Sequence, residues 1–142
     1  MHEPSPLLGG YGIFAEVVRE ISKNPITTLV KICHNIKKKP LDKGNRNFQP
    51  SNLEFTSIDV NNNAHNVIPA TAIAKFNIRF NNLQTTSSLR KKINRIVSTT
   101  CKKNKCKFKL EFMANGEAFL TKPNKIILNA KKIIKKVTKI NP

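Results

Sequence analysis

Acidic side chains are scarce in this chain of 142 residues, where eight Asp and Glu stand against 26 Lys and Arg. Only two of the acids are aspartates, Asp42 and Asp59, and the histidines are His2, His34 and His65. A hydrolytic centre with two metal ions needs several carboxylates and imidazoles that converge. The sequence has no His-x-Asp pair and no adjacent glutamates, and no serine or cysteine stands with a plausible base and orienting acid. We therefore expect no catalytic residue and no metal ligand in this chain.

Cysteine is also rare, and Cys33, Cys101 and Cys106 form an odd count without the spacing of a disulfide framework. This usage is typical of a reducing compartment. Cys101 and Cys106 have the spacing of half a metal site, but no second pair accompanies them, so we favour buried thiols. No apolar run approaches the ~20 residues that span a bilayer, and a secretory signal is not recognisable. We expect a cytoplasmic protein without a membrane partner.

The chain has a net charge of +18, because basic side chains far outnumber acidic ones. Such a charge is typical of proteins that bind nucleic acid or an anionic membrane. An excess of Lys, Asn and Ile also arises by codon drift in an A+T-rich genome. The lysines are spread over every segment, and aromatic residues make up only 6% of the chain. We therefore expect no nucleic-acid partner, and a basic nucleic-acid-binding module is the alternative.

The clearest structural pattern is a strict alternation of apolar and polar residues over residues 72–80. A period of two predicts a strand with one buried face. Residues 53–60 predict a weaker strand, because the parity of their apolar residues changes midway, which indicates a bulge or an edge position. The polar connection between the two cannot continue the ladder, since Pro69 donates no amide.

Amphipathic helices and one more strand are predicted around this pair. The expected helices cover residues 24–39, 87–100 and 126–137, and the expected strand covers 106–112. Asn24 is a good cap and Pro25 suits the first helical position, while Pro40 ends that helix. Thr86 or Ser87 is expected to cap the second helix. The order predicts an α+β ferredoxin-like two-layer sandwich, an antiparallel sheet with two helices on one face, whose first strand is missing or replaced. A C-terminal helix follows it.

Three short motifs carry a resemblance to a known family. TSIDV at 56–60, NVIPA at 66–70 and FNIRF at 76–80 resemble, at this spacing, the lid (dimerisation) domain of the succinyl-diaminopimelate desuccinylases. These enzymes are a branch of the dinuclear-zinc amidases. Similar segments of that family match NPI at 24–26 and GEAFLTKP at 116–123.

The resemblance implies three parts. Residues 1–22 lie outside the family, residues 23–117 form the lid domain, and residues 118–142 form a linker and the first helix returning to an absent catalytic domain. The family hydrolyses N-succinyl-LL-2,6-diaminopimelate to succinate and LL-2,6-diaminopimelate, in lysine and peptidoglycan-precursor biosynthesis, with two zinc ions. This truncated chain is expected to bind no zinc and to be inactive alone.

By the same resemblance, Asn66 hydrogen-bonds the substrate across a homodimer and Arg79 pairs with a substrate carboxylate. A guanidinium forms bidentate, charge-assisted bonds to a carboxylate. The alternative for Arg79 is a solvent-facing charge. Thr27 stands where the family has a histidine that helps to hold the oxyanion, and threonine supplies no cationic donor. The partners expected are a second copy or a catalytic domain on another chain, and a purely structural dimerisation module is a further alternative.

The missing first strand leaves residues 1–22 with two interpretations. Residues 13–21 place their apolar side chains on one helical face, which predicts a short amphipathic helix. In the family's sheet, however, the first strand lies centrally, and each unsatisfied buried amide costs about 1–3 kcal/mol. We therefore favour residues 11–18 as a substitute strand, with closure of the sheet by a second chain as the other solution.

Overall fold

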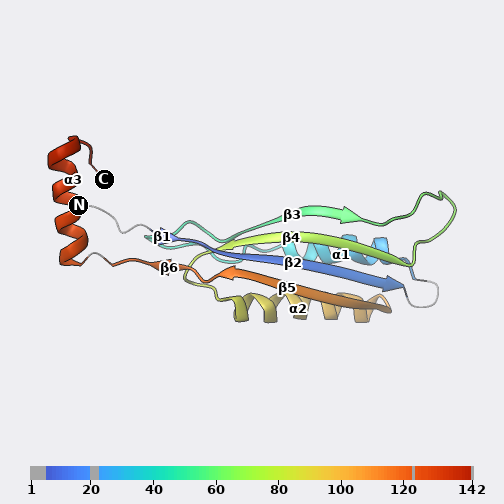
Figure 1. Cartoon of the computed structure of the whole chain (residues 1–142). Coiled ribbons are helices and arrows are strands. Elements are labelled where there is room, and N and C mark those ends of the chain that lie inside the picture. Colours follow the sequence, from blue (N-terminus) through green and yellow to red (C-terminus); the bar gives the residue numbers. More distant parts are fainter. Residues whose placement is uncertain (1–5, 20–22, 123, 142) are drawn as a thin grey trace.

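Two helices pack against one face of a four-stranded antiparallel sheet in the computed structural model, which describes residues 6–19, 23–122 and 124–141 (Figure 1). The strand order is β3-β4-β2-β5. The elements are β2 (Gly9–Arg19), α1 (Pro25–Lys37), β3 (Asn52–Asp59), β4 (Thr71–Phe80), α2 (Thr86–Lys103) and β5 (Cys106–Gly116). This arrangement confirms the predicted α+β two-layer sandwich.

β2 occupies the centre of the sheet, where it pairs with both β4 and β5. Its odd-numbered residues from Tyr11 to Val17 are almost fully buried under the helices. The short amphipathic helix expected over residues 13–21 is therefore wrong over its described part, and the substitute strand over residues 11–18 is confirmed. The physical reason is that a strand here satisfies the backbone of two neighbours at once, which a helix cannot do. Ile21 lies outside the described residues.

β3 is an edge strand and also carries an irregularity. Its register with β4 shifts between Phe55 and Ser57. Over this interval β3 advances by two residues while β4 advances by one, from Phe76 to Lys75. Ile58 follows the shift and pairs with Ala74. The extra residue of the bulge therefore explains why the apolar residues change parity along this segment. Both readings of the weak strand, a bulge and an edge position, are confirmed.

Side-chain caps fix the starts of α1 and α2. The Asn24 Oδ1 atom accepts a hydrogen bond from the amide of Ile26 at 2.9 Å, as expected for a helix that begins at Pro25. The cap of α2 is Thr85, one residue earlier than expected. Thr85 has extended backbone angles, and its side chain and that of Ser88 each accept from the other's amide. This reciprocal pair is a capping box.

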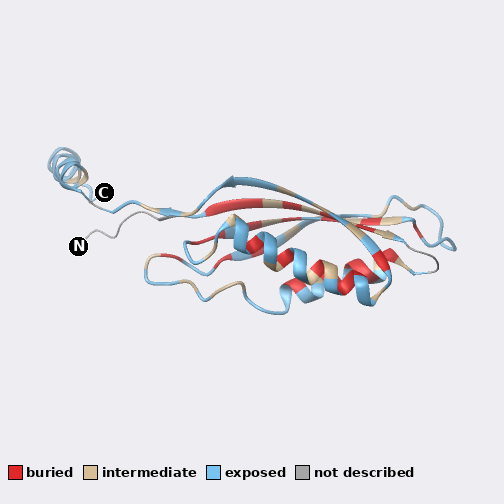
Figure 2. Ribbon diagram, turned by 90° about the horizontal axis from the view of Figure 1, so that it is seen from below, coloured by how far each residue is buried: buried red, intermediate tan, exposed pale blue. Residues whose placement is uncertain are grey.

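The hydrophobic core lies between the helices and the sheet, as Figure 2 shows from the helix side. The rings of Tyr11 and Phe112 stack with centroids 5.5 Å apart, and those of Phe55 and Phe76 lie 5.2 Å apart. No helix of the sandwich covers the opposite face of the sheet (Figure 1). We call this surface the open face.

The polar loop between α1 and β3 is organised by the carboxylate of Asp42. Its Oδ1 atom accepts hydrogen bonds from the amides of Gly44 and Ser51 and from the side chain of Asn81, at 2.7–3.0 Å. Burial alone raises the pKa of Asp42, but these hydrogen bonds outweigh it and lower the pKa to about 2. Gly44 has φ of +69°, a conformation that glycine adopts without strain.

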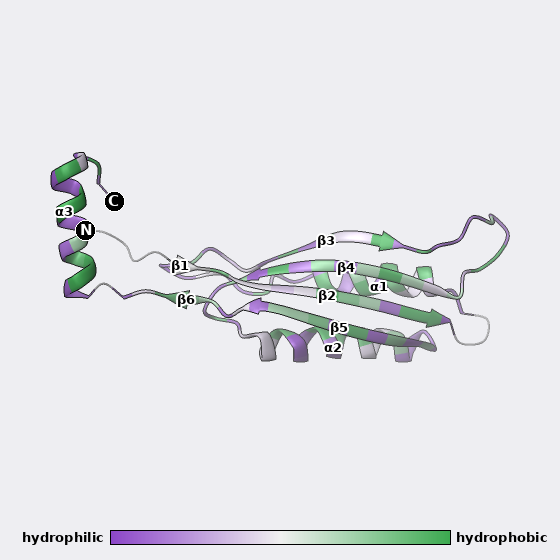
Figure 3. Ribbon diagram, in the orientation of Figure 1, coloured by the Kyte–Doolittle hydropathy of each residue, from purple (hydrophilic) through white to green (hydrophobic). Residues whose placement is uncertain are grey.

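A narrow extension leads away from the sandwich to the C-terminal helix α3 (Lys125–Thr138) (Figure 1). It contains the short strands β1 (Pro6–Leu7) and β6 (Phe119–Leu120), which pair with each other. α3 has no buried residue, so its apolar stripe, coloured green in Figure 3, lies in solvent. The expected divisions of the chain at residues 22 and 117 stay predictions. Among the described residues, no helix is long and apolar enough to cross a bilayer.

Candidate functional site

Asn66 lies in the exposed connection between β3 and β4. Asn62 braces this connection, since its side chain donates to the carbonyl of Val67 at 2.8 Å and accepts from the amide of Ala64 at 3.1 Å. Arg19, at the end of β2, donates to the carbonyl of Ile68 at 3.3 Å. Hydrogen bonds within the loop and to β2 therefore fix the loop in place. Asn66 is exposed to solvent in this position.

Arg79 lies on the open face, near the end of β4, and its side chain is exposed. It pairs across the sheet with Gly10 of β2 and with Asn52 of β3. A Cβ atom on Gly10 would lie 3.5 Å from the Arg79 Nη1 atom and 3.6 Å from the Asn115 Nδ2 atom. The guanidinium thus lies over a glycine and beside Asn115 of β5.

The structure does not bring Asn66 and Arg79 together within one chain. The eight steps of β4 from Thr71 to Arg79 span about 27 Å at 3.3–3.4 Å per residue, and Asn66 lies beyond the far end of that strand (Figure 1). Both side chains can contact one small molecule only if they come from two chains.

The titratable residues do not fit a dinuclear metal centre. In the part of the chain that the structure describes, no three His, Cys, Asp or Glu residues are grouped so that they could hold a metal ion. His34 and His65 are exposed, and the Asp42 carboxylate is engaged by the loop that it organises. No metal-dependent step is therefore assigned to these residues.

Cys101 and Cys106 are core residues, with 1% and 7% of their surfaces exposed. Burial, and then the neighbouring Cys106, raise the pKa of Cys101 to about 11. The Sγ atom of Cys106 lies 3.3 Å from the Thr28 hydroxyl, within hydrogen-bond distance. Both side chains are buried, which confirms the simpler interpretation of these cysteines as buried thiols.

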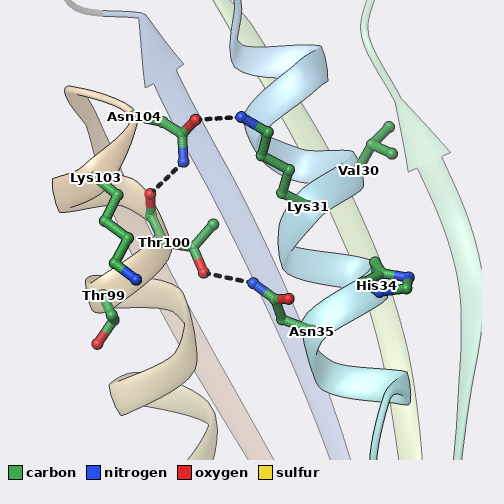
Figure 4. A pocket seen from close by; sticks show the side chains of 8 residues that line it. All are labelled: Val30, Lys31, His34, Asn35, Thr99, Thr100, Lys103 and Asn104. Carbon is green, nitrogen blue, oxygen red and sulfur yellow. Dashed lines mark hydrogen bonds between the residues drawn. The ribbon is translucent and has the colours of Figure 1, made fainter.

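A groove of about 620 Å³ lies between α1 and α2 (Figure 4). Lys31 of α1 donates to the Oδ1 atom of Asn104 at 2.7 Å, and Asn35 donates to the Thr100 hydroxyl at 3.2 Å. Asn104 in turn donates to the Thr100 carbonyl at 2.7 Å. These polar groups satisfy one another across the helices, so the groove's contacts hold α1 against α2.

A pocket of about 360 Å³ lies on the open face, on the same side of the sheet as Arg79. It is lined by Gly12, Ile13, Phe14, Thr56, Lys75, Phe76, Asn77, Glu111 and Met113. Sequence reasoning missed this pocket. The available signal was the pair of glycines at alternate positions 10 and 12, which has meaning only once the segment is known to be a strand.

The sequence of this chain is similar to those of known proteins. The family model for the peptidase dimerisation domain matches residues 18–105. The chain is 54% identical over 121 residues to a succinyl-diaminopimelate desuccinylase of Pelagibacter ubique, covering 85% of this chain and 32% of that enzyme. It is 39% identical over 135 residues to the enzyme of the same name from Rickettsia bellii, covering 95% and 34%. The chain thus spans about a third of the length of these relatives.

Solved structures show the same fold at low sequence identity. A dinuclear metal-binding peptidase of the M20 family from Bacillus subtilis matches 99% of this chain with 35% of its own, at a TM-score of 0.71 and 11% identity. An amidase of the hydantoinase/carbamoylase family from Burkholderia vietnamiensis matches 96% with 34%, at a TM-score of 0.73 and 9% identity. From the match of the family model and the relatives together, this chain belongs to the peptidase dimerisation domain family.

Proposed function

We propose that these residues form the lid of a succinyl-diaminopimelate desuccinylase, which pairs with a second copy and contributes substrate contacts to an active site assembled between chains. In the intact enzyme two zinc ions would activate water for hydrolysis of the succinyl amide. Among the described residues, no group of His, Cys, Asp or Glu could hold these ions, so we expect the chain alone to be inactive. The likeness to the desuccinylases supports the substrate, N-succinyl-LL-2,6-diaminopimelate.

The observation that carries the proposal is the position of two residues relative to the edge strand. Arg79 pairs with Asn52, where β3 begins, and Asn66 follows the end of β3 at Asp59. An edge strand offers a row of unpaired backbone groups to another chain. If two copies pair antiparallel through β3, the end of one β3 lies beside the start of the other. Asn66 of one copy then lies toward Arg79 of its partner.

In that arrangement the two side chains act on different parts of one substrate. The Arg79 guanidinium pairs with a carboxylate, with two parallel N–H donors in a geometry that the strand fixes. Asn66 supplies a hydrogen bond from the partner, so each site is complete only in the dimer. Thr27 is exposed in the first turn of α1 and supplies no positive charge.

The proposal is tested by sedimentation of the purified chain and of two charge variants. Ile58→Lys places a charge on the β3 edge, where Ile58 is 57% exposed, and should convert a dimer to a monomer. Met113→Lys places the same charge on β5 at the opposite edge, where Met113 is 71% exposed, and should leave the dimer intact. A monomeric parent chain, or a dimer that only Met113→Lys dissociates, would contradict pairing through β3.

A purely structural dimerisation module remains the competing function. It predicts dimers of the same mass but no role for Arg79. The discriminating measurement is binding of succinate or of the full substrate, followed by NMR. The lid proposal predicts that added ligand changes the NMR chemical shifts of Arg79 and Asn66, and that Arg79→Gln abolishes these changes. A purely structural module predicts no ligand-induced changes.

A further inference from the structure

The two helices of the sandwich carry charge of one sign only. Lysine and arginine occur twice in α1 and six times in α2, whereas neither helix contains an aspartate or a glutamate. The acidic residues that the structure describes lie on strands and loops, among them Glu16 and Glu111 on the open face. The basic residues are dispersed along the sequence, but the fold leaves the helical layer without a negative side chain of its own.

The groove between α1 and α2 lies within this layer and continues along the seam of the helices. An adjoining hollow of about 260 Å³ shares three of its residues and adds Arg95. On α2, Arg95, Thr99 and Lys103 follow one another at intervals of four residues, so they form a row about 12 Å long on one side of the helix. Figure 4 shows Lys31 and Asn35 on α1, on the opposite side of the seam from Thr99 and Lys103.

The lysines of the groove have no acidic partner. The Lys31 ammonium donates to the Asn104 Oδ1 atom at 2.7 Å, which holds it across the seam but uses only one of its three N–H groups. Among the described residues, the Lys103 ammonium has no hydrogen bond or ion pair. Both positive charges are therefore free to contact an anion, and one of them is already held in place.

We propose that this groove binds a small molecule that carries two or more adjacent phosphate groups. Its volume lies in the range of small-molecule sites, about 300–1,000 Å³. Lys31 and Lys103 contact phosphate oxygens from opposite helices. Arg95 supplies two parallel N–H donors to the end of the phosphate chain, and the Thr99 hydroxyl donates between them.

The spacing of the cations selects a phosphate chain over a single anionic group. One carboxylate or phosphate cannot contact both ends of a row about 12 Å long, whereas a chain of phosphates presents charge along its length. The groove lies on the helix side of the sheet, and Arg79 lies on the open face. The inference therefore goes beyond the proposed function and does not depend on it.

The test is an NMR titration of the full chain with inorganic triphosphate, with inorganic phosphate as the matched ligand of one group. We expect saturable binding of triphosphate, with chemical-shift changes at Asn35 and Thr99. Lys103→Glu and Lys31→Gln should each weaken it about tenfold, since each removes a charge-assisted hydrogen bond. Lys75→Glu makes the same charge reversal at an exposed position of the open face and should leave the affinity unchanged.

Several outcomes would overturn the site. They are the absence of saturable binding at millimolar concentration, equal affinity for phosphate and triphosphate, and an equal loss of affinity in Lys103→Glu and Lys75→Glu. The last of these would mean that only the total charge matters. A short single-stranded oligonucleotide carries the same phosphate groups on a polymer. If it shifts the groove residues while triphosphate does not, the ligand is a nucleic acid and the small-molecule site is wrong.

Discussion

Asn52 and Arg79 face each other across β3 and β4 at the point where the edge strand begins. The last residue of that strand, Asp59, instead leads into the loop that carries Asn66. One edge strand thus has a substrate-binding candidate at each end. Under the proposed function, a second chain is therefore needed to complete the site.

The central position of β2 predicts that the N-terminal segment is indispensable for folding. Deleting residues 1–21 removes the strand that separates β4 from β5. The loss of two ladders exceeds a typical net stability of about 5–15 kcal/mol. We expect the truncated chain to show no cooperative thermal unfolding by circular dichroism. A cooperative melt at the temperature of the full chain would make the segment dispensable.

Gly9 should tolerate no side chain. A Cβ atom there would lie 2.3 Å from the Phe80 ring, which is fully buried. Gly9→Ala is therefore expected to lower the free energy of unfolding by about 1–3 kcal/mol, the usual cost of overpacking. Urea denaturation measures this change, and Gly12→Ala on the same strand is the control that should remain near the parent. Equal stabilities for both variants would argue against the close approach.

Asp42 should make the fold sensitive to acid. Its pKa falls from an ordinary value of 3.8 to about 2 in the folded chain, so folding favours the charged carboxylate. The stabilisation is present above about pH 4 and is lost as the pH falls toward 2. Asp42→Ala should be less stable than the parent by about 1–3 kcal/mol at pH 7, and the difference should shrink in that acidic window. A difference independent of pH would contradict the hydrogen-bonded carboxylate.

Nucleic-acid binding, if the charge of +18 produces any, should be non-specific. Counterion release makes such binding weaken by about 10³-fold or more between 50 and 200 mM salt when several phosphates are contacted. Fluorescence anisotropy with two unrelated oligonucleotides should give equal affinities that fall with salt. A complex that persists at 200 mM and discriminates between the sequences would favour the nucleic-acid module.

Periodicity predicted most of the sandwich but not its centre. The strict alternation over residues 72–80 has only one interpretation, and the structure has a strand there. The apolar residues Ile13, Phe14, Val17 and Val18 fit both a helical face and a strand, so only the needs of the neighbouring strands decide between them. Tertiary pairing, which a local pattern does not contain, made the difference.

The sequence proposed individual residues for the candidate site but not their geometry. Motif resemblance pointed to Asn66 and Arg79, yet their separation depends on the direction of β4 and the register of β3. The open-face pocket depends on which face of β2 carries Gly12, and on the register that places Asn77 and Met113 beside it. Neither is readable from composition or spacing alone.

The central claim is that Asn66 of one copy approaches Arg79 of the other. The direct measurement is a pulsed electron resonance distance between spin labels on two chains, one carrying Asn66→Cys and the other Arg79→Cys. Both positions are exposed, and burial keeps the native Cys101 thiol protonated at neutral pH. The account predicts an interchain distance clearly shorter than the span of about 27 Å along β4 within one chain. The absence of any interchain distance below that span would contradict a site shared between two copies.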